Sequence, residues 1–158
     1  MVMGRIVVGV DGSPESMAAL RWAIEEARYR GAQVETVFVF QNTPSWRLYG
    51  YQQGRPAESF DEPHEHVPEV EDRDDAHRLV GGMVDKLTHL EDVEMESVVV
   101  EDRHPAHVLV ERSEGAEMLV VGSHGRSGAS EMLLGSVSHQ CATHASCPIV
   151  IIRPRRSS

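Results

Sequence analysis

Apolar residues along the chain fall into two alternating patterns. Short runs rich in valine and isoleucine predict five buried strands, at residues 5–11, 34–40, 95–100, 118–121 and 149–152. Between these runs, apolar residues recur at steps of three and four, and this period predicts helices over 14–30, 69–90, 105–115 and from 136 onward. Alternating strands and helices are typical of an α/β fold with a parallel sheet and right-handed crossovers.

Neither period survives from Gln41 to about Pro68, where prolines and glycines interrupt the chain. We therefore expect a long loop over residues 41–68, which leaves the sheet near the carboxyl ends of the strands. The loop contains the aromatic residues Trp46, Tyr49 and Tyr51. They either cover a bound base, or pack locally or at a subunit contact. His64 and His66 lack a third spaced His or Cys, so a metal site there is not favoured.

The composition adds limits on compartment and partners. The 158 residues are 41% hydrophobic and 25% charged, which is typical of one globular domain, 1–158, and no apolar run could span a membrane. The net charge of −10 excludes nucleic acids and anionic membranes as partners. The start of the chain does not resemble a signal peptide, and Cys141 and Cys147 have no CxxC spacing. We expect a cytoplasmic protein in which both cysteines are structural.

A glycine-rich segment between the last two predicted strands carries the candidate chemistry. Gly122 and Gly125 are expected to turn the backbone with positive φ and to leave room for a ligand. Gly135 and Ser136 open the last predicted helix, whose first N–H groups and positive dipole end suit phosphate oxygens. The hydroxyls of Ser136 and Ser138 can add hydrogen bonds. A Cβ on Gly122 or Gly135 is expected to disturb phosphate binding more than folding.

Written as spacing, the segment is G-x2-G-x9-G-S, followed by HASCP before the last strand. This pattern resembles the ATP-binding branch of the universal stress protein family. The resemblance implies a three-layer, single-domain fold like that of the adenine nucleotide alpha hydrolases, with four helices and a five-stranded parallel sheet in the order 3-2-1-4-5. It also implies a nucleotide site composed of Gly9, Val10, Asp11, Val39, Gly122, Ser123, Gly125, Arg126, Gly135, Ser136, Val137 and Ser138.

Several of these positions keep a second interpretation. Asp11 either lies in the nucleotide pocket or forms an Asx turn between strand and helix. Val39 either offers its backbone to adenine, as the resemblance implies, or is core. Arg126 either neutralises phosphate charge or points to solvent. His124 has no carboxylate or nucleophile beside it in sequence, so a catalytic role is not favoured.

The function implied by the resemblance is a stress-response regulator that binds ATP, with Mg or Mn on the phosphates and no metal ligands from the protein. A slow ATPase is an alternative, although the chain lacks GxxxxGK[ST] and a carboxylate placed to polarise water. A cyclic AMP-binding module is another alternative, because the spacing of the loop does not indicate how many phosphates the ligand carries. A dimeric interaction protein with an empty pocket is the third.

The last predicted strand bears on the oligomeric state. It is apolar at every interior position and, in the order 3-2-1-4-5, lies at an exposed edge of the sheet. Proteins of the family that it resembles often pair this strand with its copy across a two-fold axis. We therefore expect a homodimer through residues 148–153.

Overall fold

The computed structural model describes residues 3–42, 69–87, 89–125 and 134–154. The expectations for the 43–68 segment and for Arg126 lie outside these residues. The described strands are β1 (Arg5–Val10), β2 (Gln33–Asn42), β3 (Glu69–Val70), β4 (Met95–Glu101), β5 (Met118–Gly122) and β6 (Ile149–Ile152). The described helices are α1 (Pro14–Arg30), α3 (Arg73–Asp85), α4 (Pro105–Arg112) and α5 (Ser136–His144).

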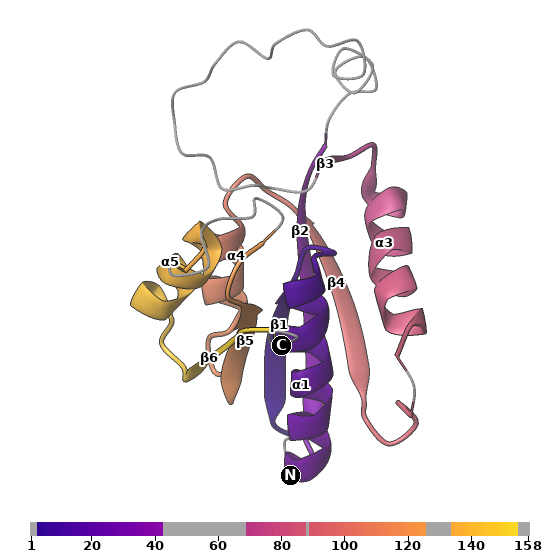
Figure 1. Ribbon diagram of the computed structural model, residues 1–158, viewed down its shortest axis with the longest axis vertical. Coiled ribbons are helices and arrows are strands. Elements are labelled where there is room, and N and C mark those ends of the chain that lie inside the picture. Colours follow the sequence, from indigo (N-terminus) through magenta and orange to yellow (C-terminus); the bar gives the residue numbers. More distant parts are fainter. Residues whose placement is uncertain (1–2, 43–68, 88, 126–133, 155–158) are drawn as a thin grey trace, which may run out of the picture.

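The five main strands form a parallel sheet in the order β4-β2-β1-β5-β6. This confirms the predicted order 3-2-1-4-5, because β4, β5 and β6 are the third, fourth and fifth predicted strands. The helices α1 and α3 cover one face and α4 and α5 the other, which completes three layers (Figure 1). Among the described helices, none combines the length and apolar character needed to cross a membrane.

Two boundaries differ from the expected ones at the far end of β2. This strand continues to Asn42, where Gln41 and Asn42 pair with Glu69 and Val70 of the short strand β3. The predicted helix over 69–90 therefore begins only at Arg73, after Asp72 caps it by accepting a hydrogen bond from the Asp75 N–H. At residues 69 and 70, backbone pairing with β2 takes the place of helix. This pairing joins distant segments, so the local period of apolar residues could not predict it.

The core consists of two apolar layers on either side of the sheet. Even-numbered residues of β2 such as Phe38 and Phe40 face α1 and α3, and odd-numbered residues such as Val37 and Val39 face α4. All four side chains are nearly inaccessible to solvent. The continuous apolar run in β2 thus reflects helices on both faces, as parallel sheets require.

A buried carboxylate lies at the amino end of the strands. Glu35 of β2 is 2% exposed. Its Oε2 accepts a hydrogen bond from Arg5 Nη1 at 2.9 Å, and its Oε1 accepts one from Arg112 Nε at 2.6 Å. Arg5 also donates to the carbonyls of Arg112 and Glu114. The cluster ties β1 and β2 to the end of α4 and pairs the buried charge on both oxygens.

Candidate functional site at the carboxyl ends of the strands

The site is a cavity above the carboxyl ends of β1, β2 and β5, closed on one side by the start of α5. It is lined by Gly9, Val10, Asp11, Ser16, Val37, Val39, Pro105, Leu109, Val121, Gly122, His124, Gly125, Gly135, Ser136, Val137 and Ser138. Of the predicted site residues, only Ser123, which lies outside the lining, and Arg126, which the structure does not describe, are missing from this set. Segments far apart in sequence therefore meet where a parallel sheet normally binds ligands.

The start of α5 supplies backbone donors to the cavity. Gly135 is the N-cap residue, in an extended conformation and without a side-chain cap, and the His139 N–H donates to its carbonyl at 2.9 Å. By helix geometry the N–H groups of Ser136, Val137 and Ser138 precede the first intrahelical hydrogen bond. Together with the positive end of the helix dipole, they form a site for an anion.

The two serines of this turn differ in what they offer. Ser136 is exposed at the first position of α5, so its hydroxyl is accessible to a ligand. Ser138 is 2% exposed, and its hydroxyl is within donating distance of the carbonyls of Ser123 at 2.9 Å and Gly135 at 3.0 Å. The expectation that the Ser138 hydroxyl donates to phosphate is therefore not supported. Ser138 instead ties the turn after β5 to the start of α5.

The glycines of the motif have a role different from the predicted one. Positive φ is found among the described glycines at Gly12, Gly31 and Gly115, and not at Gly122 or Gly125. Instead, other groups come close to these two glycines. A Cβ on Gly125 would lie 2.7 Å from Asp11 Oδ2, and one on Gly122 would lie 2.9 Å from the Cβ and 3.0 Å from the backbone carbon of Glu15.

The surroundings of Gly122 correct the expectation for a side chain at this position. Because Glu15 belongs to the first turn of α1, a side chain on Gly122 would displace that helix and disturb the fold. For Gly122, this contradicts the expectation that a Cβ would disturb phosphate binding more than folding. Gly135 is different, since its absent Cβ would meet His124 Cα and the Ser123 carbonyl at 3.3 Å, within the loop that forms the site.

Asp11 forms the Asx turn and also lines the cavity. Its Oδ1 accepts a hydrogen bond from the Ser13 N–H at 2.8 Å, which is the Asx turn. The other oxygen, Oδ2, lies close to Gly125, and both residues line the cavity. The turn leads into α1, where Ser13 caps the helix by accepting from the Ser16 N–H at 3.1 Å. One carboxylate oxygen thus shapes the backbone, and the other lies close to the glycine-rich turn.

An apolar slot adjoins these polar groups. It is lined by the side chains of Val37, Val39, Leu109 and Val121, with Pro105 at the start of α4. Sequence reasoning placed only Val39 here. Val37 lies two residues earlier on the same face of β2, so strand alternation contained the signal for it. Pro105 and Leu109 reach the site through the packing of α4 on the sheet, which no local pattern specifies.

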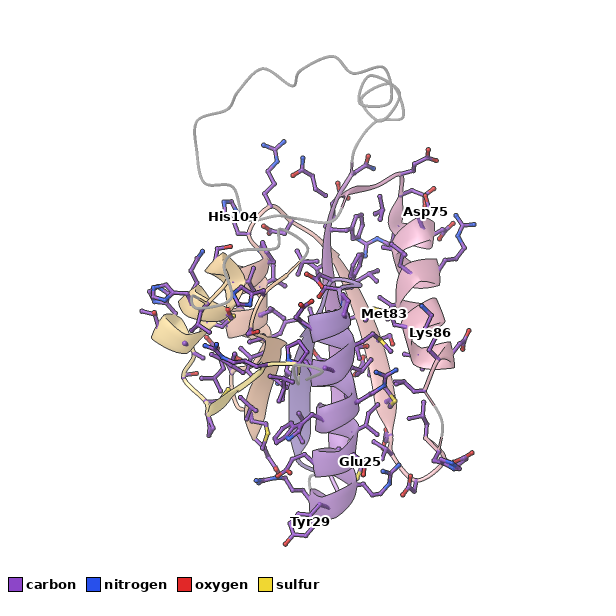
Figure 2. All side chains as sticks on the ribbon, in the orientation of Figure 1. Glu25, Tyr29, Asp75, Met83, Lys86 and His104 are labelled. Atoms are coloured by element: carbon purple, nitrogen blue, oxygen red, sulfur yellow. The ribbon has the colours of Figure 1, made fainter. Side chains whose placement is uncertain are left out.

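The structure also bears on metal binding, on the cysteines and on one carboxylate before α4. Among the described residues, no group of three or more His, Cys, Asp or Glu side chains is placed to hold a metal ion. Neither cysteine forms a disulfide within the described residues; Cys141 is buried on α5, as expected, and Cys147 is half-buried before β6. Asp102, before α4, accepts a hydrogen bond from the His104 N–H, which lowers the pKa of its carboxyl. Figure 2 places His104 at the end of the molecule opposite Tyr29.

The fold and site define an α/β domain with an anion-binding turn and an apolar slot at the carboxyl end of a parallel sheet. The model of the universal stress protein family matches residues 3–153. A universal stress protein of Mycobacterium tuberculosis, Rv2005c, is 36% identical over 148 residues, which make up 94% of this chain and 45% of that protein. The chain belongs to the universal stress protein family. It spans less than half the length of the curated relatives that it matches.

Solved structures of the same family share the fold. A universal stress protein in complex with cAMP aligns with a TM-score of 0.57 at 22% identity, covering 97% of this chain and 98% of that one. The universal stress protein of Archaeoglobus fulgidus in complex with dAMP aligns with a TM-score of 0.55 at 21% identity, covering 96% and 99%. At these identities the likeness concerns the fold.

Proposed function

We propose that this domain binds ATP at the described cavity and acts as a nucleotide-dependent regulator of the stress response, without efficient catalysis. The observation that carries the proposal is the convergence of the motif residues. Gly125, Gly135, Ser136 and Val137 line one cavity with Asp11, although the sequence separates them widely. This proposal assigns the domain to the ATP-binding branch of the family.

The parts of the cavity suit the parts of a nucleotide. The start of α5 offers backbone N–H groups and a positive dipole end to phosphate oxygens. The slot around Val39 and Leu109 suits an adenine ring, since a base needs apolar surface with a few polar groups at its edge. Asp11 lines the same cavity, and its carboxylate suits a ribose hydroxyl. Solved relatives that hold cAMP and dAMP support an adenine nucleotide as the ligand class.

The divalent ion belongs to the ligand in this proposal. Asp11 is the only carboxylate among the residues that line the described part of the cavity, and one carboxylate does not make a protein cage for a cation. Mg or Mn held by the phosphates would supply charge neutralisation there, while the residues of the chain bind and orient the nucleotide.

Analysis of the nucleotide released on denaturing the purified protein tests this proposal. We expect ATP to be released, and calorimetry of the emptied protein to give tighter binding for MgATP than for cAMP. Release of cAMP, or tighter cAMP binding, would favour the cyclic nucleotide module. Absence of binding to any adenine nucleotide would favour an interaction protein with an empty pocket.

Hydrolysis should be absent or slow. The chain has no phosphate-binding lysine in a GxxxxGK[ST] motif. Among the described residues that line the cavity, Asp11 is the one carboxylate, and the Ser13 N–H already orients it. Steady-state phosphate release should stay below about 1 per second. Release above that rate, lost in a single-residue variant of the cavity, would identify an enzyme instead.

We further propose a homodimer through residues 148–153. The strand β6 is the last in the sheet order, and Ile149, Val150, Ile151 and Ile152 are all half-buried. Val150 and Ile152 pack toward α1, whereas Ile149 and Ile151 pack toward α5. An apolar edge strand with unpaired backbone groups favours pairing with a second copy.

Light scattering of V150K and I152K tests the dimer. Either change places a charge on the edge strand, and we expect the measured mass to fall to that of a monomer in each variant that circular dichroism shows to be folded. An unchanged mass in both folded variants would place the contact elsewhere or exclude it.

A cytoplasmic location is likewise proposed. Neither Cys141 nor Cys147 forms a disulfide within the described residues, which fits a reducing compartment. Cell fractionation with an antibody should find the protein in the cytoplasmic fraction, and recovery from the exterior would overturn this assignment.

A further inference from the structure

His124, which lines the cavity, has a ring nitrogen that is not hydrogen-bonded to any described residue. Its Nε2 atom is buried, and none of the described residues supplies a hydrogen-bond partner for it. The residue lines the cavity together with the first turn of α5. A buried polar atom without a partner is uncommon, because it loses hydrogen bonds to water and gains none in exchange. Such an atom beside a cavity indicates a group that a ligand completes.

The other ring nitrogen determines what Nε2 can offer. Nδ1 lies 3.2 Å from the Ser123 hydroxyl. When this hydroxyl donates to Nδ1, the neutral ring carries its proton on Nε2, which is then a donor. A protonated ring also donates from Nε2. Only the tautomer with its proton on Nδ1 would present an acceptor to the cavity.

The surroundings select between a donor and an acceptor at Nε2. His124 Cα lies 3.3 Å from the place that a Cβ would take on Gly135, the N-cap of α5. The backbone of His124 therefore lies beside the N-cap of that helix, whose first N–H groups are donors at a positive dipole end. A ligand bound there must supply acceptors and negative charge. The state of His124 that matches such a ligand has its proton on Nε2.

We infer that the Nε2–H of His124 donates a hydrogen bond to a phosphate oxygen of the bound nucleotide, and that this contact makes the site prefer phosphorylated nucleotides over nucleosides. The inference rests on the proposed function and deepens it. Ser123 is then a positioning residue. Its carbonyl is held by the Gly135 N–H at 2.8 Å, and its hydroxyl keeps the ring of His124 in the donor tautomer.

Calorimetry with MgATP and with adenosine on three proteins tests this inference: the wild type, H124N and H124Q. Asparagine keeps a polar group near the position of Nδ1 and lacks the distant donor, whereas the glutamine amide reaches toward the position of Nε2. We expect H124N to weaken MgATP binding at least tenfold, about 1.4 kcal/mol, and to leave adenosine binding unchanged. H124Q should recover most of the MgATP affinity.

A purely structural role for His124 predicts a different result. In that case H124N weakens MgATP and adenosine equally and H124Q rescues neither, which overturns the inference. Unchanged MgATP affinity in folded H124N overturns it as well. If the wild type binds neither ligand, the proposed function itself fails. If the wild type binds MgATP and adenosine equally, the nucleotide site is supported and the proposed role of His124 is contradicted.

A measurement on the wild type avoids any doubt about folding of the variants. The imidazole 15N resonances of His124 report which ring nitrogen is protonated and whether it is hydrogen-bonded. Addition of MgATP should shift the Nε2 resonance, and addition of adenosine should leave it in place. Equal shifts with both ligands, or no shift with MgATP, would contradict a phosphate contact.

Discussion

The two ends of the parallel sheet differ in how far their polar groups are paired within the chain. At the amino end, the buried carboxylate of Glu35 is paired on both oxygens by Arg5 and Arg112. At the carboxyl end, the first N–H groups of α5 and the Nε2 of His124 meet a cavity rather than partners from the described chain. Polar groups that the chain satisfies stabilise the fold, and those that it leaves open define where a ligand belongs.

The largest effect is expected from breaking the amino end. The variant E35A removes the carboxylate that pairs two arginines, and the free energy of unfolding should fall by about 3 kcal/mol. MgATP affinity, measured where the variant is folded, should stay within twofold of the wild type. The control E96A changes an exposed glutamate on the neighbouring strand β4 and should alter stability by less than about 0.5 kcal/mol. A large loss of affinity in E35A would show that the two ends are not separate in function.

The next effect is expected at the carboxyl end. The variant G135V puts a branched side chain against His124 and the Ser123 carbonyl, so the turn that faces the ligand must move. MgATP affinity should fall at least tenfold, about 1.4 kcal/mol, in calorimetry. The control G82A adds a Cβ to an exposed glycine of α3 with open space around it, and should leave affinity unchanged. Equal affinities in the two folded variants would remove the start of α5 from the site.

A smaller effect separates folding from binding within the carboxyl end. The Ser13 hydroxyl caps α1 but does not line the cavity. Thermal unfolding of S13A should show a loss of about 1 kcal/mol, because the Ser16 N–H loses its acceptor. MgATP affinity should change little. A loss of affinity without a loss of stability would mean that Ser13 acts on the ligand.

The smallest effect concerns pH. The His104 N–H lowers the pKa of Asp102 in the folded protein, so this carboxylate adds stability above its unfolded pKa, near 3.9. That stability is lost as pH falls through the lower, folded pKa. The variant D102N should therefore be slightly less stable than the wild type at pH 7, by less than about 0.5 kcal/mol because the group is partly exposed. The difference should vanish in strong acid, and a difference that grows there would contradict the assignment.

Local patterns were sufficient for most of the fold. Apolar runs placed the five main strands, and the three-to-four period placed the four described helices, because burial against helices on both faces imposes these patterns directly. The strand order required the resemblance carried by the G-x2-G-x9-G-S spacing. The two-residue strand β3 escaped prediction, since its pairing with Gln41 and Asn42 joins distant segments.

The candidate site divides in the same way. The sequence alone determined that a glycine-rich turn precedes a helix start at Gly135, because glycine and helix-start chemistry are local. Only the tertiary structure decided that the glycines serve close packing instead of positive φ, since Gly122 faces Glu15 and Gly125 faces Asp11 across chain separations that no pattern records. It also decided that the Ser138 hydroxyl has partners within the chain, while the Nε2 of His124 has none among the described residues, because hydrogen-bond partners are determined by proximity in space.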